Sequence, residues 1–241
     1  MKLVKSLLSL LNYFLKRKPK QTPVQPVIEV PAPSVDESPV EEPILDLEIY
    51  KTIPLPTGKT MTASVDTLRK VAELTDVRAD YMALIIALES SFDYTVKAKT
   101  SSATGWFQII NQTWGVLMSR YARQYDIPTD GGEDLRKDPR INALMGAELI
   151  KENIKVIKPA IGRDLTLLEI YLAHFFGAGH AKRFILAPAN ANAVEMFTDQ
   201  ARANPSIFYK NGSLARTIKE VSTVLEKRIA TNLKLVNKTF N

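Results

Sequence analysis

The distribution of proline divides this chain into two parts with different folding properties. Nine of its fourteen prolines lie between residues 19 and 56, among acidic side chains and few aromatic ones. Because proline removes a backbone N–H donor and fixes φ, such a segment favours an extended, polyproline-like linker. From about Thr62 onward, apolar residues recur with the period of an α-helix. We therefore expect a mainly α domain over residues 50–241, preceded by a linker over residues 19–49.

The apolar pattern of the domain predicts a series of helices. They are expected at residues 65–74, 78–91, 113–125, 139–157, 166–175, 181–186, 191–200 and 218–234. Ser64 is expected to cap the first of them, and Pro159 to follow the end of the fourth. Residues 82–88 are almost entirely apolar, which predicts a helix buried around most of its circumference. The one strand pattern is a weak one at residues 105–110.

The first eighteen residues predict an amphipathic helix with a cationic face. Its apolar arc consists of Leu3, Val4, Leu7, Leu8, Leu10, Leu11, Phe14 and Leu15. The arc is too short to span a bilayer, which needs about 20 apolar residues, and the interrupting lysines make residues 1–18 a poor signal peptide. Three uses of this helix remain open: lying on an anionic membrane surface, docking to a virion or other partner, and self-association.

The net charge of +6 is unevenly distributed along the chain. Residues 1–20 hold six basic and no acidic side chains, residues 21–50 hold seven acidic and no basic ones, and the remainder has a net charge of +7. A basic domain favours polyanions such as nucleic acid, anionic lipid or an anionic cell wall, although a solvated lysine-rich surface explains the charge equally well. Because no recognised nucleic-acid motif accompanies the charge, we expect no nucleic-acid partner.

The chain has no cysteine and two histidines, His174 and His180. This composition excludes disulfides and thiolate chemistry, and it argues against a His/Cys metal site. No loop has ligands at the spacing of an EF-hand. We expect neither a metal nor a cofactor.

A single carboxylate, Glu89, ends the apolar run that begins at Ala83. A carboxylic acid held among apolar side chains has its charged form disfavoured, so it can donate a proton near neutral pH. The polar Ser/Thr segment that follows, and Gln108 after it, suit an enzyme that protonates a glycosidic oxygen.

The segment from Glu89 to Gln108, ESSFDYTVKAKTSSATGWFQ, resembles the signature of lytic transglycosylases with the goose-lysozyme-like fold. That signature is a catalytic Glu followed by Ser, an aromatic residue, an acid or Asn, and a small-residue stretch that closes on G-x-x-Q. Further strings, YKTIPLPT, LRKDPRINALMGAELIKEN, YLAHFFGAG and ANPSIFY, resemble the peptidoglycan-cleaving endolysins of phiKZ-type giant phages. The resemblance covers residues 50–211 and beyond, and it implies a lysozyme-like domain that acts on peptidoglycan.

The resemblance implies that Glu89 is the sole catalytic acid and base. It would protonate the oxygen between MurNAc and GlcNAc and then accept the proton of the muramyl C6 hydroxyl, which gives a 1,6-anhydromuramyl end. A hydrolase of the usual kind needs two carboxylates, whereas this reaction needs one. The product distinguishes the two mechanisms, because no water is consumed.

The resemblance also implies that Gln108, Tyr121, Glu152 and Tyr171 line the substrate cleft. The polar side chains of Ser101, Ser102 and His174 make them further candidates for substrate binding. Alternatives remain open for most of them: turn chemistry explains the two serines, an ion pair with Lys151 or Lys155 explains Glu152, and burial in the core explains the tyrosines and His174. Lys182 and Arg183 are candidates for contact with peptide-stem carboxylates.

Two departures from the family pattern affect the site. Ser102 stands where the pattern G-A-x-G-L-M-Q has its first glycine, which predicts a stiffer loop. The family string A-Y-N-A-G is replaced by residues 173–177, AHFFG, so Phe175 cannot make the hydrogen bond of the family's asparagine. The phiKZ-like relatives share this second change.

The resemblance predicts a phage protein that acts on the cell wall in the periplasm, from the virion or from inside the infected host. It would release progeny as an endolysin, or open the wall from the virion at the start of infection. The alternative is a virion structural or anchoring protein whose lysozyme-like domain has little activity. An intact Glu89 favours the enzyme.

Overall fold

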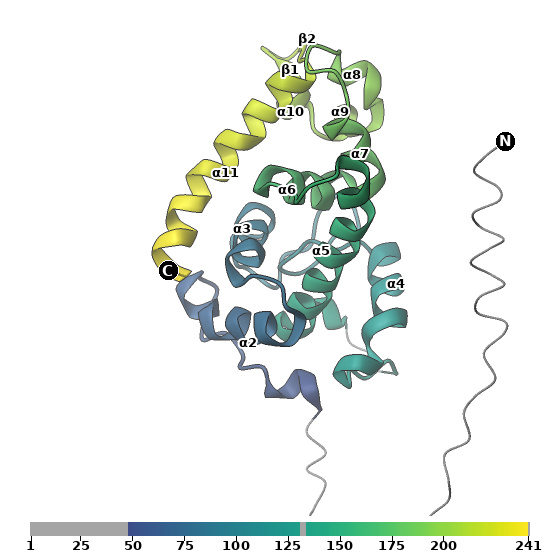
Figure 1. Ribbon diagram of the computed structural model, residues 1–241. Coiled ribbons are helices and arrows are strands. Elements are labelled where there is room, and N and C mark those ends of the chain that lie inside the picture. The colour runs from purple at the N-terminus through teal and green to yellow at the C-terminus, as the bar shows by residue number, and fades with distance from the viewer. Residues whose placement is uncertain (1–47, 131–133, 241) are drawn as a thin grey trace, which may run out of the picture. The chain divides into compact units, whose positions relative to one another are not determined.

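The computed structural model describes residues 48–130 and 134–240 (Figure 1). The amphipathic helix predicted for residues 1–18 lies outside the described residues, as does the predicted linker apart from its last two residues. No helix in the described ranges is both long enough and apolar enough to cross a membrane.

The described residues are mainly helical. The helices are η1 (Ile49–Thr52), η2 (Thr62–Ser64), α2 (Val65–Thr75), α3 (Ala79–Glu89), α4 (Asn111–Tyr121), η3 (Arg123–Tyr125), η4 (Leu135–Lys137), α5 (Pro139–Ile161), α6 (Leu167–Phe176), α7 (Ala178–Ile185), α8 (Ala193–Met196), α9 (Thr198–Ala203), α10 (Pro205–Phe208) and α11 (Ile218–Phe240). Strands β1 (Tyr209–Lys210) and β2 (Leu214–Ala215) pair antiparallel.

Helix α5 is the centre of the domain, and α2, α3, α4, α6 and α7 all pack against it (Figure 1). Its N-terminus is fixed by Asp138, whose carboxylate accepts from the backbone N–H of Arg140, and by a proline at the first helical position. Its C-terminus is closed by Gly162 in the left-handed conformation, φ +70°. Both ends are therefore defined by local chemistry.

Helix α3 is held between α5, α2 and α11, with residues 82–86 buried. Helix α6 starts with a capping box, in which the Thr166 hydroxyl accepts from the N–H of Glu169 and the Glu169 carboxylate accepts from the N–H of Thr166. The Arg163 guanidinium binds the same carboxylate with two hydrogen bonds of 2.7 and 2.8 Å. These last contacts fix the start of α6, the helix that carries Tyr171.

Helix α11 lies along one side of the domain, where it packs against α3 and α6 (Figure 1). Apolar residues spaced three, four or seven apart form its buried face. They are Ile218, Val221, Leu225, Ile229 and Val236. The helix runs to Phe240, six residues beyond the predicted end at 234.

Helix α2 begins at Val65 with Ser64 as its N-cap residue, as predicted, but the Ser64 hydroxyl makes no capping hydrogen bond and donates instead to the carbonyl of Thr60. Several other predicted boundaries are wrong for identifiable reasons. Pro159 does not precede a break, because the hydrogen bond it removes falls in an exposed last turn and α5 continues to its Gly162 cap.

The helix predicted at 191–200 is divided into α8 and α9 by Phe197, which has φ −135° and ψ 53°. This break turns the Phe197 ring into an aromatic cluster with Phe176, Phe184 and Phe208. The gain in aromatic burial outweighs the local helical preference. Residues 113–125 likewise form α4 followed by the separate turn η3.

Candidate active site

A cavity of about 340 Å³ lies at the C-terminal end of α3, with Glu89 in its wall. Its lining comes from α3, the segment before α4, and helices α4, α5 and α6. The lining residues are Glu89, Gln108, Ile109, Ile110, Thr113, Leu149, Asn153, Ala173, His174, Phe175, Phe176 and Gly177. Glu89 is the single carboxylate among these twelve, and most of the others are apolar.

Glu89 is the last residue of α3, so its position follows from the burial of that helix. The two residues at 91 and 92, just beyond it, have left-handed backbone conformations with φ 51° and 67°. Such conformations are unfavourable for non-glycine residues and often occur at functional sites. The reversal carries Phe92 into the core, where it is 3% exposed, and leaves Glu89 at the cavity.

Tyr171 of α6 lies near Glu89, behind the residues that line the cavity. Its pKa is raised by burial, then by the negative charge of Glu89 and by side-chain hydrogen bonding to that carboxylate. The ring is 4% exposed and stacks on Phe175 with centroids 5.8 Å apart. A rigidly packed phenol therefore lies against the carboxylate of Glu89.

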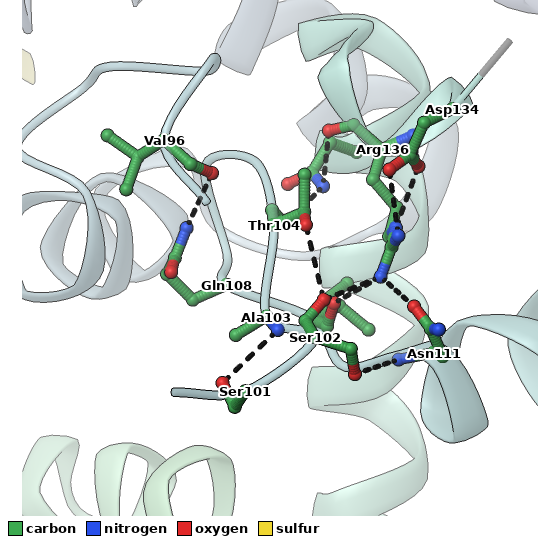
Figure 2. Close-up of polar contacts among 11 residues, drawn as sticks. Val96, Ser101, Ser102, Ala103, Thr104, Gln108, Asn111, Asp134 and Arg136 are labelled. Atoms are coloured by element: carbon green, nitrogen blue, oxygen red, sulfur yellow. Dashed lines mark hydrogen bonds and ion pairs between the residues drawn. The ribbon is translucent and has the colours of Figure 1, made fainter. Parts of the chain in front are cut away.

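Gln108 enters the cavity from the tight turn that starts at Gly105. Its side-chain Nε2 donates to the carbonyl of Val96 at 3.1 Å (Figure 2) and to that of Gly105 at 2.8 Å. The φ of Gln108 is 48°. With both amide hydrogens directed at the backbone, Oε1 is the atom left to accept from a ligand. This orientation agrees with the predicted role of Gln108 beside the acid.

Gly105 is required by the turn for two reasons. Its φ is +82°, and a Cβ would lie 2.1 Å from the carbonyl oxygen of Arg136 and 2.4 Å from Nδ2 of Asn142. Both features exclude a side chain at this position. The predicted strand at 105–110 is reduced to single bridges of Thr104 with Lys97 and Ile109.

The same turn is clamped from outside by Arg136 (Figure 2) and by Asn142. The Arg136 guanidinium donates to the carbonyl of Ser102 (2.7 Å) and to Oδ1 of Asn111 (2.5 Å), and it binds both oxygens of Asp134 at 2.7 Å. Asn142 accepts from the N–H of Phe107 and donates to the Arg136 carbonyl, both at 2.9 Å. This polar network, with Arg136 and Asn142 buried, holds the Gln108 turn against α5.

The two predicted serines are part of this network (Figure 2). The Ser101 hydroxyl accepts from the N–H of Ala103, and the Ser102 hydroxyl accepts from the N–H of Asn111 at the start of α4. Neither serine is among the lining residues of the cavities described here. The turn and capping bonds match the alternative interpretation of these residues, and their contact with substrate stays a prediction.

His174 lies in the cavity wall and contacts the Gln108 turn. Its Nε2 is 2.9 Å from the carbonyl oxygen of Phe107, and since a carbonyl only accepts, Nε2 carries the proton. Its Nδ1 is buried and has no hydrogen-bond partner among the described residues. His174 therefore connects α6 to the turn while it lines the site.

A second cavity, of about 350 Å³, adjoins the first between α4 and α5. Thr113, Leu149 and Asn153 line both cavities. Glu152 lies in the second one, where it accepts from the Tyr121 hydroxyl (2.5 Å) and pairs with the Arg120 guanidinium (2.9 Å).

The Tyr121–Glu152 contact changes the acidity of both groups. The pKa of Tyr121 is raised to about 12 by burial and by this hydrogen bond. The pKa of Glu152 is lowered, chiefly by the same bond and then by Arg120. Glu152 thus pairs with Arg120, where the sequence suggested Lys151 or Lys155.

Asn153 was not singled out from the sequence. It is 7% exposed, lines both cavities, and its side-chain amide makes no hydrogen bond to another described residue. The one signal in the sequence is its spacing from Leu149 and Val156, four before and three after, which places these residues on one face of α5.

The architecture agrees with a comparison to known families. The sequence model described as "Transglycosylase SLT domain" matches residues 66–196, which is more than half of the chain and contains both cavities. Members of this family are lytic transglycosylases that act on peptidoglycan. The mainly α, lysozyme-like fold, the location of Glu89 and the match together show that the chain belongs to the transglycosylase SLT domain family.

Proposed function

We propose that the protein cleaves the β-1,4 bond between MurNAc and GlcNAc and leaves a 1,6-anhydro-MurNAc end, with Glu89 as its single acid and base. The observation that carries this proposal is that Glu89 is the single carboxylate in the wall of its cavity. Hydrolytic glycosidases of the usual kind place a second carboxylate about 5 to 9.5 Å from the first. The lining supplies none.

The reaction balances with one carboxyl group. Glu89 donates its proton to the glycosidic oxygen as the bond from C1 to that oxygen breaks. The Glu89 carboxylate then accepts the proton of the muramyl C6 hydroxyl as the C6 oxygen bonds to C1. The carboxyl group is regenerated, and general acid–base catalysis of this kind contributes about 10²–10⁴-fold to the rate.

The neighbours of Glu89 suit supporting roles in both steps. Tyr171 donates to the carboxylate in the interval when it is charged, and packing on Phe175 holds the phenol in place. Gln108 presents Oε1 to a sugar hydroxyl. Phe175, which is half-buried in the cavity wall, supplies apolar surface for a pyranose ring.

The test of this proposal compares wild type with Glu89→Gln on purified peptidoglycan, with mass spectrometry of the products. Wild type should release muropeptides with anhydro ends, each one water molecule lighter than a hydrolysis product. Glu89→Gln should lose at least about a hundredfold in rate. Glu226→Gln on the exposed side of α11 is the matched control and should retain full activity. Reducing MurNAc ends, or undiminished cleavage by Glu89→Gln, would refute the mechanism.

We further propose that the enzyme is phage-borne and acts in the periplasm. The ordered strings shared with phiKZ-type endolysins support this origin. Residues 1–18 would hold the enzyme to a virion or a membrane surface. Mass spectrometry of purified virions tests the virion role: absence of the protein from the particle would leave the endolysin role. A catalytically silent virion protein is the alternative, and an inactive wild type in the peptidoglycan assay would favour it.

A further inference from the structure

Lys59 precedes the residues matched by the family model, and it contacts the loop that follows Glu89. Its Nζ lies 2.8 Å from Oδ1 of Asp93 and donates to Oγ1 of Thr95 at 2.7 Å. The same ammonium group lies 5.5 Å from the centroid of the Tyr94 ring. One side chain from outside the matched region therefore holds three successive residues of this loop.

We infer that Lys59 is a positioning residue for the reaction: it holds the loop of residues 90–96, which connects Glu89 to the carbonyl that orients Gln108. The inference rests on the proposed function, because it takes Glu89 and Gln108 to act on the same substrate. Lys59 lines neither of the two cavities described above, so it acts through the loop and not on the sugar.

The loop begins with an unfavourable backbone conformation. Ser91 and Phe92 have φ values of 51° and 67°, in the left-handed region that non-glycine residues avoid. Two such residues in succession persist only where the surrounding contacts hold them. The N–H of Asp93 donates to the carbonyl of Ser90 at 3.0 Å, so Asp93 closes the reversal directly after Glu89.

The Asp93 carboxylate is the centre of the contacts that hold the loop. Its Oδ1 accepts from the N–H of Thr95 at 2.9 Å and from the Thr95 hydroxyl at 2.6 Å, in addition to its contact with Lys59. Hydrogen bonds from Lys59 and then from Thr95 lower the pKa of Asp93 to about 2. The carboxylate is therefore charged at neutral pH, where its contact with Lys59 is an ion pair.

The far end of the loop reaches Gln108. The carbonyl of Val96 accepts from the N–H of Gly105 at 2.9 Å and from Nε2 of Gln108 at 3.1 Å (Figure 2). Because Val96 directly follows Thr95 in the chain, a shift of the loop at Thr95 would displace the carbonyl that orients Gln108. The two ends of the loop thus lie at the acid and at the amide, and Lys59 holds its middle.

The backbone on either side of Lys59 is anchored to the domain. The N–H of Thr57 donates to the carbonyl of Ala63 at 3.2 Å, and Met61 is buried. The side chains of the ion pair itself are 45% exposed for Lys59 and 36% exposed for Asp93. Since an ion pair this exposed contributes little to global stability, its loss should affect the loop more than the fold.

The test replaces Lys59 by Met and by Arg and measures cleavage of soluble peptidoglycan strands. Lys59→Met should lower kcat about tenfold, as expected for a displaced catalytic geometry, and leave KM within about twofold. Lys59→Arg keeps the cation and should restore kcat to within about twofold of wild type. In an Asp93→Asn background, Lys59→Met should cause little further loss, because the ion pair is already absent.

The matched control is Lys70→Met, which removes another exposed ion pair, with Glu73 on the same helix α2. It should keep full kcat. Lys59→Met and Lys70→Met should shift the midpoint of urea unfolding by similar small amounts, because both lose one exposed pair.

Fluorescence of Trp106 reports on the loop without any substrate. Trp106 is fully buried, donates from Nε1 to the carbonyl of Phe92 at 2.9 Å, and packs edge to face against Phe92 and Tyr94. The chain has two tryptophans, so Trp114→Phe leaves Trp106 as the single one. In that background, Lys59→Met should shift the emission to longer wavelength and increase its quenching by acrylamide, whereas Lys59→Arg should do neither.

Unchanged kcat in Lys59→Met, or a loss of kcat that Lys59→Arg does not restore, would overturn the inference. So would a loss of kcat accompanied by a much larger fall in stability than in Lys70→Met, because the role of Lys59 would then be structural. An inactive wild type would refute the proposed function instead, and the emission and quenching of Trp106 would still decide whether Lys59 holds the loop.

Discussion

Nε2 of His174 donates to the carbonyl oxygen of Phe107 across 2.9 Å, which connects the helix that carries Tyr171 to the turn that carries Gln108. The rings of these two residues also meet edge to face with centroids 5.9 Å apart. Two parts of the site that are distant in the sequence are therefore held in one geometry.

Replacing His174 by Phe should keep the aromatic contact and remove the donor. The Phe107 carbonyl would lose its partner, so the free energy of unfolding should fall by about 1–3 kcal/mol, and kcat should fall because the Gln108 turn loses its contact with α6. Thermal unfolding and peptidoglycan cleavage are the measurements. The exposed His180→Phe provides the comparison and should change neither. Unchanged stability in His174→Phe would show that the bond is not formed in solution.

Gly105→Ala should be strongly destabilising. The left-handed φ of +82° and the approach of the Arg136 carbonyl together predict a loss of about 2–4 kcal/mol in urea unfolding. Gly115→Ala is the matched control, and we expect the opposite effect on stability. Gly115 lies inside α4, and no atom lies within 4 Å of the position that a Cβ would take. Alanine there should stabilise the protein by about 0.5–1 kcal/mol. A neutral Gly105→Ala would contradict the turn geometry.

The Asp134–Arg136 pair predicts a defined pH dependence of stability. Hydrogen bonds from Arg136 lower the pKa of Asp134 below its ordinary value. The stabilisation is therefore present above about pH 4, where the unfolded carboxyl is ionised, and it is lost as pH falls through the lower folded-state pKa. Asp134→Asn should be less stable than wild type by about 1–2 kcal/mol at pH 7, and the difference should shrink steadily below pH 4.

The control for that experiment is Asp199→Asn. Its ion pair with Arg202 is 3.5 Å long and its side chain is 87% exposed, so the effect should stay below about 0.5 kcal/mol at every pH. Urea unfolding of the three proteins across pH 3–7 is the measurement. A difference between wild type and Asp134→Asn that persists at low pH would mean that charge does not stabilise the pair.

Tyr171→Phe should separate catalysis from folding. The ring and its stacking on Phe175 remain, so the melting temperature should change little. The hydroxyl beside Glu89 is lost, and kcat should fall about tenfold or more, as expected for a hydrogen bond to a charged group. Tyr81→Phe, on the opposite end of α3, should keep full activity. Equal activity of both variants would remove Tyr171 from the site.

A chain that begins at residue 46 should fold and cleave peptidoglycan as the full chain does. Residues 46–241 form a compact unit of their own, and both cavities are lined between residues 89 and 178. Circular dichroism, thermal unfolding and the cleavage assay check this expectation. Loss of cooperative unfolding would place part of the domain within residues 1–45.

The positions of the main helices could be predicted from the sequence because their apolar periodicity is strong. Glu89 could be proposed as the acid as well, since a lone carboxylate at the end of an apolar run is unusual, and its catalytic role stays a prediction. The break at Phe197 could not, because it depends on a cluster with Phe176 and Phe184, which are close only after folding. Local preference favoured a continuous helix, and tertiary packing reversed it.

The candidate site likewise contains residues that could be predicted from the sequence and residues that could not. Gln108 and His174 are found in the predicted cavity, whereas the hydroxyls of Ser101 and Ser102 bond to the backbone of their own loop and its neighbouring helix. The place of Asn153 in the cavity wall could not be predicted, because a polar residue beside Glu152 in a lysine-rich helix has the pattern of a solvated face. Its importance depends on where α4 meets α5, and this meeting is not visible in a local pattern.

Helix α11 has a practical consequence for anyone who expresses this enzyme in pieces. The family match ends at residue 196, but Val221, Leu225 and Ile229 of α11 pack in the core beside α3. A fragment that ends at the family boundary would expose the apolar surface of α3, the helix that ends in Glu89. This fragment should therefore aggregate and be recovered from inclusion bodies. The smallest piece worth expressing therefore reaches the end of α11, at Phe240.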